Sequence, residues 1–233
     1  MNKYKKFISL LTLLVLFGIF SAVVAIAKEE PGVQSRGVVE ESLSTCELAH
    51  QWVESHQGEL PQNYEDFLKV PRAYRRTVFS ALPSEIKSKI WIGHINWYLS
   101  NQKDLNDRQL VLLQEAIDFL KQPNLYAVPV DSLQNSEIEQ SLLELEGEIR
   151  DAYGDKEAGL ILEMGQFRDN SHQSEVESSS LLLQPECECS IYSDYCWLNG
   201  PQGSSCYDTA CHDISWGCGT FGIYKCDGEC LIF

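Results

Sequence analysis

Positive charge is scarce in this 233-residue chain, which has 18 lysines and arginines against 34 aspartates and glutamates and a net charge of −16 at pH 7. Removal of residues 1–27 would take away three lysines and no acid, leaving 15 basic and 34 acidic side chains and a net charge of −19. Binding to nucleic acid or to anionic lipid requires a positive surface. The composition therefore argues against both partners.

The sequence also lacks the short motifs of common catalytic and cofactor sites. It contains no H-E-x-x-H, G-x-S-x-G or G-x-x-x-x-G-K pattern, no glycine-rich dinucleotide fingerprint and no EF-hand-like spacing of acids. The histidines are expected to be surface or core residues rather than ligands: His50, His56, His94, His172 and His212. We therefore predict that the protein is not an enzyme and has no catalytic residue, cofactor or metal site.

Cysteine is nearly absent before residue 187 and abundant after it. The last 47 residues hold eight of the nine cysteines: Cys187, Cys189, Cys196, Cys206, Cys211, Cys218, Cys226 and Cys230. This density is well above the ~8–10 % that is typical of a disulfide scaffold, and the even number fits a closed set of bridges. A segment this short buries too little apolar surface to be stable without covalent links. The eight residues are therefore disulfide candidates, although the sequence does not specify their pairing.

Zinc binding is the alternative use of these cysteines. Cys211 with His212, and Cys226 with Cys230, could supply ligands, but the tail lacks the paired C-x-x-C knuckles of structural zinc sites. The remaining Cys46 stands alone near the start of the helical region. It is either an intermolecular disulfide partner or, as we favour, a buried free thiol that packs as a small apolar group.

The N-terminus has the pattern of a secretory signal peptide. Lys3, Lys5 and Lys6 precede an uncharged, mostly apolar run over residues 7–27, and Ala25 and Ala27 give a small-x-small site that predicts cleavage after Ala27. Export would bring the cysteines to an oxidising compartment, so we predict a secreted protein with no stable membrane span after cleavage. The alternative is an uncleaved N-terminal membrane anchor, since 21 residues could just span a bilayer.

Residues 44–165 are predicted to form a helical bundle domain. Ser44 with Glu47, Asn106 with Gln109, and Ser136 with Glu139 have the spacing of N-terminal caps. Pro83 fits the first turn of a helix that reaches about Leu99, and Gly165 fits a helix end. Apolar stripes at helical spacing follow the caps: Ala49, Trp52 and Val53; Leu110, Leu113, Ile117 and Leu120; Ile138, Leu142, Leu145 and Ile149.

The large aromatic residues of this region are expected to form its core rather than a ligand pocket. They are Trp52, Phe67, Phe79, Trp91 and Trp97. The fold class that we predict is mainly α: a flexible N-terminal segment over residues 28–43, the helical domain over 44–165, a linker over 166–186 and a cysteine-rich module over 187–233. The linker has no period and few large apolar groups, which favours a flexible tether and a protease site.

Turn signals divide the cysteine-rich module. Gly217-Cys218-Gly219 and Asp227-Gly228 are typical of turns, and residues 214–216 and 221–224 are predicted to form a short β-hairpin. The module carries six acids against Lys225 alone, a net charge of −5. It is therefore not a cationic membrane-seeking peptide.

Several positions besides the cysteines support a family resemblance. The tail runs Cys187-Glu188-Cys189-Ser190, Ser193-Asp194-Tyr195-Cys196 and Gly217-Cys218-Gly219-Thr220, and the helical region carries Leu60-Pro61, Tyr64, Phe67, Pro71, Tyr74-Arg75-Arg76 and Trp91. In these residues the tail resembles the small cysteine-rich bacteriocin fulvocin C. The chain as a whole is similar to the secreted bacteriocin fulvocin C-related proteins.

Two functional hypotheses follow. The resemblance implies an antibacterial precursor whose cysteine-rich tail is the effector, with exposed aromatic residues at Tyr195, Trp197, Trp216, Phe221 and Phe233 or a specific receptor replacing the missing cationic charge. The alternative is a secreted, non-catalytic binding module without antibacterial activity, in which helices and tail act together. In both cases we expect an extracellular or cell-envelope target that the sequence does not identify.

Overall fold

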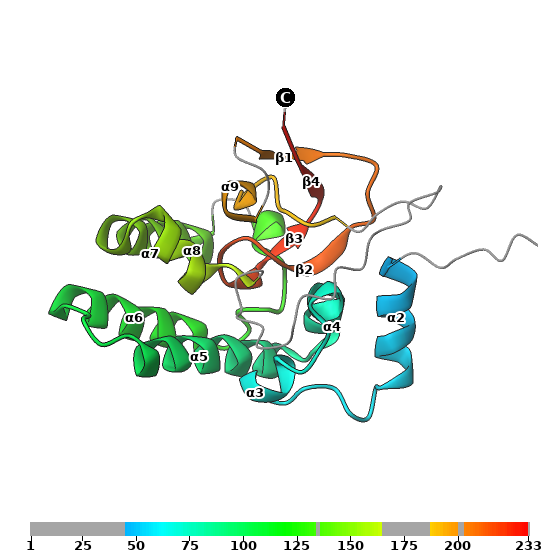
Figure 1. The fold of residues 1–233 in the computed structure, drawn as a ribbon, viewed down its shortest axis with the longest axis horizontal. Coiled ribbons are helices and arrows are strands. Elements are labelled where there is room, and N and C mark those ends of the chain that lie inside the picture. The colour runs from blue at the N-terminus through cyan, green and yellow to red at the C-terminus, as the bar shows by residue number, and fades with distance from the viewer. Residues whose placement is uncertain (1–44, 134–135, 165–186, 200–202, 233) are drawn as a thin grey trace, which may run out of the picture. The chain divides into compact units, whose positions relative to one another are not determined.

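The computed structural model describes residues 45–133, 136–164, 187–199 and 203–232. The predicted signal peptide, the segment 28–43 and the linker 166–186 lie outside these residues, as do Ser44, Gly165, His172 and Phe233. The domain boundaries drawn there stay predictions. Within the described residues, helices come first and short strands with disulfides follow, which confirms the predicted fold class (Figure 1).

The helical region contains α2 (Thr45–Ser55), α3 (Tyr64–Phe67), α4 (Arg75–Ala81), α5 (Ser84–Asn101), α6 (Asp107–Leu120), α7 (Glu137–Tyr153) and α8 (Asp155–Leu162), with short 3-10 turns η1 (Arg72–Tyr74) and η2 (Val130–Leu133). Two of the predicted caps are present. The Asn106 side chain accepts from the Gln109 backbone N–H and the Gln109 side chain accepts from that of Asn106, each at 3.0 Å. The Ser136 hydroxyl accepts the Glu139 N–H at 3.1 Å. These bonds satisfy donors that the first turn leaves unpaired.

Pro83 lies one position earlier than predicted, at the N-cap of α5 rather than in its first turn. Its ψ of 149° is extended, so the helix begins at Ser84 and runs to Asn101. The Pro83 carbonyl nevertheless accepts the N–H groups of Ile86 and Lys87 at 2.9 and 3.0 Å. Because an N-cap needs no N–H donor of its own, proline fits this position as well as the first turn.

The cysteine-rich region contains α9 (Cys196–Asn199), β1 (Ser205–Asp208), β2 (Ile214–Cys218), the 3-10 turn η4 (Thr220–Gly222), β3 (Tyr224–Cys226) and β4 (Gly228–Leu231). Strand β1 pairs antiparallel with β4, placing Cys206 opposite Cys230. Strand β2 pairs antiparallel with β3, placing Ile214 opposite Cys226. The predicted hairpin is therefore present, but its second strand starts later than predicted: of residues 221–224 only Tyr224 lies in β3, and Phe221 lies in η4 with φ of 54°.

The helical and cysteine-rich regions share one apolar core. Trp216 on β2 and Phe221 on η4 belong to the same buried cluster as Phe79 and Trp91 of α4 and α5. The rings of Trp91 and Phe221 meet edge to face at 5.5 Å, and so do those of Tyr126 and Trp216. The Tyr126 hydroxyl also donates to the Phe221 carbonyl at 2.9 Å. The β2–β3 hairpin of the tail is thus packed on the helices (Figure 1).

The predicted core aromatics are buried to different degrees. Phe67, Phe79 and Trp91 are fully buried, whereas Trp52 and Trp97 are half-buried at the edge of the cluster. Leu110 was expected on the buried stripe of α6 but is 44 % exposed, because the buried face of this helix is centred on Leu113 and Ala116. No helix among the described residues is both long and apolar enough to cross a membrane.

Candidate functional site

Four disulfides hold the cysteine-rich region together: Cys187–Cys211, Cys189–Cys206, Cys196–Cys230 and Cys218–Cys226. The region is therefore a disulfide scaffold, as its composition predicted. The sulfur atoms of Cys189, Cys196 and Cys206 lie within 4.8 Å of one another, a spacing that could suit a metal ion. Each of these sulfurs is in a disulfide, however, and zinc binding requires thiolates. In the oxidised protein this cluster is two adjacent bridges.

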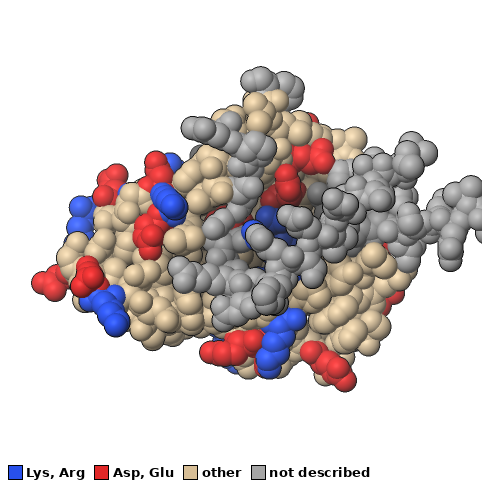
Figure 2. Space-filling view, in the orientation of Figure 1, with Lys and Arg blue, Asp and Glu red and all other residues tan. Residues whose placement is uncertain are grey.

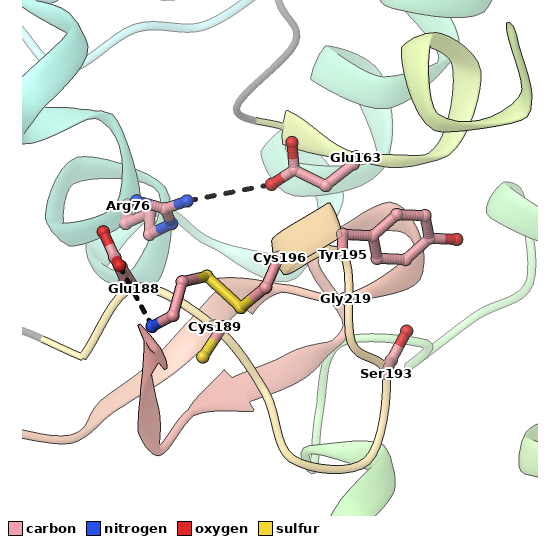
Figure 3. A pocket seen from close by; sticks show the side chains of 9 residues that line it. Arg76, Glu163, Glu188, Cys189, Ser193, Tyr195, Cys196 and Gly219 are labelled. Atoms are coloured by element: carbon pink, nitrogen blue, oxygen red, sulfur yellow. Dashed lines mark hydrogen bonds and ion pairs between the residues drawn. A yellow bond between two sulfur atoms is a disulfide. The ribbon is translucent and has the colours of Figure 1, made fainter. Parts of the chain in front are cut away.

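A small cavity lies beside these two bridges, where the cysteine-rich loops meet α4 and the end of α8 (Figure 3). Its lining includes Arg76, Glu163, Glu188, Ser193 and Tyr195. The volume of about 40 Å³ is enough for ordered water but far below the roughly 300–1,000 Å³ of a pocket for a drug-sized ligand.

The charged groups of the cavity are largely engaged with each other. Arg76 and the buried Glu163 face each other at 3.8 Å, and Glu188 accepts the Cys230 N–H at 3.1 Å (Figure 3). The buried Nε of Arg76 has no hydrogen-bond partner among the described atoms. The cavity brings together an ion pair and hydroxyls, without a nucleophile held by a general base among its described side chains.

A network of three hydroxyls connects the cysteine-rich loops to α7. The Thr220 hydroxyl donates to Glu146 at 2.5 Å, and the hydroxyls of Ser193 and Tyr195 lie 3.2 and 3.0 Å from the Thr220 oxygen. The Thr220 backbone N–H donates to the Ser193 hydroxyl at 3.1 Å. Burial, reinforced by the charge of Glu146, raises the pKa of Tyr195 well above its usual range, so this phenol stays protonated.

Lys87 on α5 is buried against the cysteine-rich region. Its ammonium donates to the Ser80 carbonyl at 3.0 Å and lies 4.8 Å from the ring centre of Trp216. Burial lowers the pKa of Lys87 to about 8. The cation–π contact and the carbonyl partly compensate for lost hydration. Lys87 therefore contributes to the packing of α5 against the cysteine-rich region.

Lys225 on β3 lies among three carboxylates. Its ammonium is 3.6 Å from Asp227, 3.8 Å from Asp213 and 3.9 Å from Asp131. Burial raises the pKa of Asp131, partly against the effect of Lys225. On the face shown in Figure 2, the described basic side chains are interspersed with acids and form no continuous positive patch.

The aromatic residues that were expected to be exposed in the tail are mostly buried. Tyr195, Trp216 and Phe221 are 5 %, 7 % and 0 % exposed, which corrects that expectation, and Trp197 is 36 % exposed. The three buried rings belong to the core that the cysteine-rich region shares with the helices. Local sequence patterns could not predict this burial, because rings such as Phe221 and Trp216 pack on residues from distant parts of the chain.

Other apolar residues of the cysteine-rich region take the exposed positions. Together with Trp197 they are Ile191, Tyr192, Tyr207 and Ile232. No sequence pattern singled these out beforehand. Tyr207 lies on β1, where Ser205, Tyr207 and Asp208 are all exposed, so burial on this short strand does not alternate and a period-2 pattern gives no signal for it. Ile191 and Tyr192 lie in an irregular loop, where no periodic signal exists.

The isolated cysteine and the histidines have different settings. Cys46 lies in the first turn of α2, with its side chain outside the described part of the structure. His94 is a core residue, hydrogen-bonded to Tyr64 and to the Leu160 carbonyl, whereas His50 and His212 are exposed. His56 is half-buried and stacks on Trp52.

No family model, curated protein or solved structure matches this chain.

Proposed function

We propose that the protein is a secreted, non-catalytic binding protein in which the helices and the cysteine-rich region act as one unit. The observation that carries this proposal is the shared core. Trp216, Phe221 and Ile223 of the tail are each at most 7 % exposed, and all pack in the cluster that contains Phe79 and Trp91. A released tail would bring these apolar groups into water at a cost of about 1.5–3 kcal/mol for each side chain.

The disulfides support an extracellular site of action, because four bridges persist in an oxidising compartment. We infer that export uses the N-terminal segment and that cleavage follows Ala27. The cavity beside the bridges, where charged and hydroxyl groups converge, is too small for a drug-sized ligand, so we place the binding function on the surface of the region instead.

The exposed apolar side chains of the cysteine-rich region are the recognition surface that we propose. The 43 described residues of this region hold five of the ten exposed large apolar residues among those described. Tyrosine and tryptophan are enriched at protein interfaces because a large ring buries much area and loses little conformational entropy. Loops fixed by disulfides lose less entropy on binding than free loops do. We therefore infer an extracellular or cell-envelope protein as the partner.

The test is binding of the labelled intact protein to bacterial cells, the target class that the family resemblance implies. The variant pair Tyr192→Ser and Tyr207→Ser is expected to lower the amount bound at least tenfold. Val111→Ser on α6 and Leu143→Ser on α7 are the matched controls, since both parent residues are at least half exposed and lie on the helical region. Equal losses in both pairs, or no loss in the tyrosine pair, would reject the proposed surface.

Antibacterial activity, which the family resemblance implies, is assayed in the same experiment. Growth inhibition by the intact chain would indicate that the protein that carries this surface is itself an antibacterial effector. Inhibition by residues 187–233 alone would contradict the proposal that helices and tail act together. Inhibition by neither form, with binding retained, fits a binding module that does not kill.

A further inference from the structure

Two histidines that are far apart in the sequence meet at the protein surface. The ring centres of His50 on α2 and His212, just before β2, are 6.1 Å apart, with the ring planes at 83°. They belong to opposite ends of the described chain, one from the helical region and one from the cysteine-rich region. No motif in the sequence pairs them.

Neither imidazole is engaged with the rest of the described structure beyond this ring contact. Both residues are exposed, and neither ring has a hydrogen bond to a described residue. The other described histidines differ: both ring nitrogens of His94 are within hydrogen-bond distance of a partner, and Nδ1 of His56 is 2.8 Å from the Trp52 carbonyl. Within the described part of the chain, nothing therefore occupies the ring nitrogens of His50 and His212, and an external ligand can reach them.

The spacing fits two imidazoles on one metal ion. A zinc–nitrogen bond is roughly 2.0–2.1 Å long, and the centre of an imidazole ring lies about 1 Å beyond its ligating nitrogen. Two imidazoles that bind one ion at a tetrahedral or wider N–metal–N angle therefore have ring centres roughly 5–6.5 Å apart. The observed 6.1 Å lies in this range. Both side chains are exposed, so their rotamers can change to direct the nitrogens toward a common ion.

Both residues sit on fixed backbone. The His212 carbonyl accepts the Cys187 N–H at 3.1 Å, and its neighbour Cys211 is disulfide-bonded to Cys187. His50 follows the fully buried Ala49, and Trp52 and Val53 of the same helix pack against the core. A site on rigid elements loses little entropy when it binds its ligand.

We propose that His50 and His212 form a bidentate site for a late first-row transition-metal ion, with water completing the coordination. Neutral imidazole suits Cu²⁺, Ni²⁺ and Zn²⁺, and the general order of affinities places Cu²⁺ first. The net charge of −16 raises the concentration of cations near the surface. The bound ion links α2 to the cysteine-rich region and so stabilises their packing.

The experiment titrates Cu²⁺, and separately Zn²⁺, into the oxidised full chain by calorimetry and follows Tm in parallel. We expect one ion per chain with a rise in Tm, and at least a tenfold loss of affinity in either His50→Ala or His212→Ala. Electron paramagnetic resonance of the Cu²⁺ form is expected to show two imidazole nitrogens. His56→Ala is the control on the α2 side of the site and is expected to bind like the parent.

Stoichiometry distinguishes a shared site from two independent ones. A bidentate site binds one ion per chain, and either single variant keeps only the weaker binding of one imidazole, whereas two independent sites bind two ions and each single variant loses one ion without weakening the other. Since both substitutions are at the surface, all variants should keep the parent Tm without metal within a few degrees. Unchanged Cu²⁺ affinity in both single variants, or two ions bound per parent chain, would overturn the proposal.

Discussion

The Thr220 hydroxyl donates a 2.5 Å hydrogen bond to the carboxylate of Glu146, across 74 positions of the chain. Because its proton goes to Glu146, the nearby hydroxyls of Ser193 and Tyr195 act as donors to the Thr220 oxygen. One carboxylate on α7 therefore orients the hydroxyls of the cysteine-rich loops. A buried network of this kind fixes one arrangement of its members and is costly when one member is missing.

Removal of the Glu146 carboxylate should therefore destabilise the protein. We expect Glu146→Ala to lower the free energy of unfolding by about 1–3 kcal/mol, since the hydroxyls lose a charged acceptor. Glu146→Gln should cost less because its amide oxygen can still accept. Denaturant unfolding under oxidising conditions measures the difference. The matched control is Glu144→Ala, an exposed position on the same helix, and equal effects at the two positions would contradict the role of the network.

The shared core predicts that the cysteine-rich region needs the helices for a unique fold. Phe221 is fully buried and touches Trp91 and Phe119, so Phe221→Ala in the full chain should cost about 3–5 kcal/mol. Residues 187–233 alone, oxidised to four disulfides, should show poorly dispersed amide resonances and no cooperative thermal transition. A well-dispersed spectrum of the isolated region would contradict this prediction, and the Tm of the full-chain variant tests it independently.

Local patterns in the sequence predicted the parts of this fold that depend on neighbouring residues. The Asn106 capping box needs only Gln109, three positions away, and the β2–β3 hairpin needs a turn between two short apolar runs. The disulfide character of the tail followed from composition, but the pairing of Cys196 with Cys230 depends on loops that no local rule describes.

The contacts between distant segments could not be predicted in the same way. Phe221 looked like a strand residue because an apolar run surrounds it. In the structure it has φ of 54°, which places its ring in the helical core instead of along β3. The meeting of His50 with His212 is likewise a product of tertiary packing, and a single sequence carries no signal for it.

Acid should destabilise the protein through His94. The Nε2–H of this buried ring donates to the Leu160 carbonyl at 2.9 Å, and Nδ1 accepts from the Tyr64 hydroxyl at 3.2 Å, as expected of a neutral imidazole. Burial lowers the pKa of His94 from 6.5 to about 4. Between these values the unfolded state binds the proton and the folded state does not, so stability falls as the pH drops from 6.5 to 4.

The expected loss from this one group reaches about 3 kcal/mol below pH 4. The measurement is the free energy of unfolding against pH for the parent and for His94→Gln, which cannot take up a proton. The difference between the two curves isolates His94 from the carboxylates that titrate in the same range. A difference that stays constant between pH 4 and 7 would rule out this assignment.

An increase of pH above about 7.5 should stabilise the protein through Lys87. Burial lowers the pKa of Lys87 in the folded state to about 8, below the ordinary 10.5 of the unfolded chain. Between these values the unfolded state holds more protons, so stability should rise with pH. The comparison is best limited to pH 7.5–9.5, because buried tyrosines such as Tyr195 begin to oppose the trend when unfolded tyrosines ionise near pH 10.

The size of this rise is on the order of 1 kcal/mol, since the Ser80 carbonyl and the Trp216 ring favour the charged form. Lys87→Met keeps the length of the side chain and should remove the slope of stability against pH. Lys89→Met, at an exposed position on the same helix, should leave it in place. If the slope survives in Lys87→Met, another group is responsible for it.

Gly219 should tolerate no larger residue, for two separable reasons. Its φ of +64° is strained for residues with a Cβ, and a Cβ there would lie 2.6 Å from atoms of both Ser193 and Tyr224. Gly203 also has a positive φ, of +89°, but a Cβ added there would meet no described atom within 4 Å. Gly203→Ala therefore measures the cost of a positive φ without a clash, which should be about 1 kcal/mol. Gly219→Ala adds the clash and the cost of a ψ of −164°, which with a positive φ is nearly restricted to glycine, and should cost at least about 1–3 kcal/mol more. Thermal unfolding of the two variants gives both values, and equal losses would show that the loop at Ser193 moves aside freely instead of being held by Thr220.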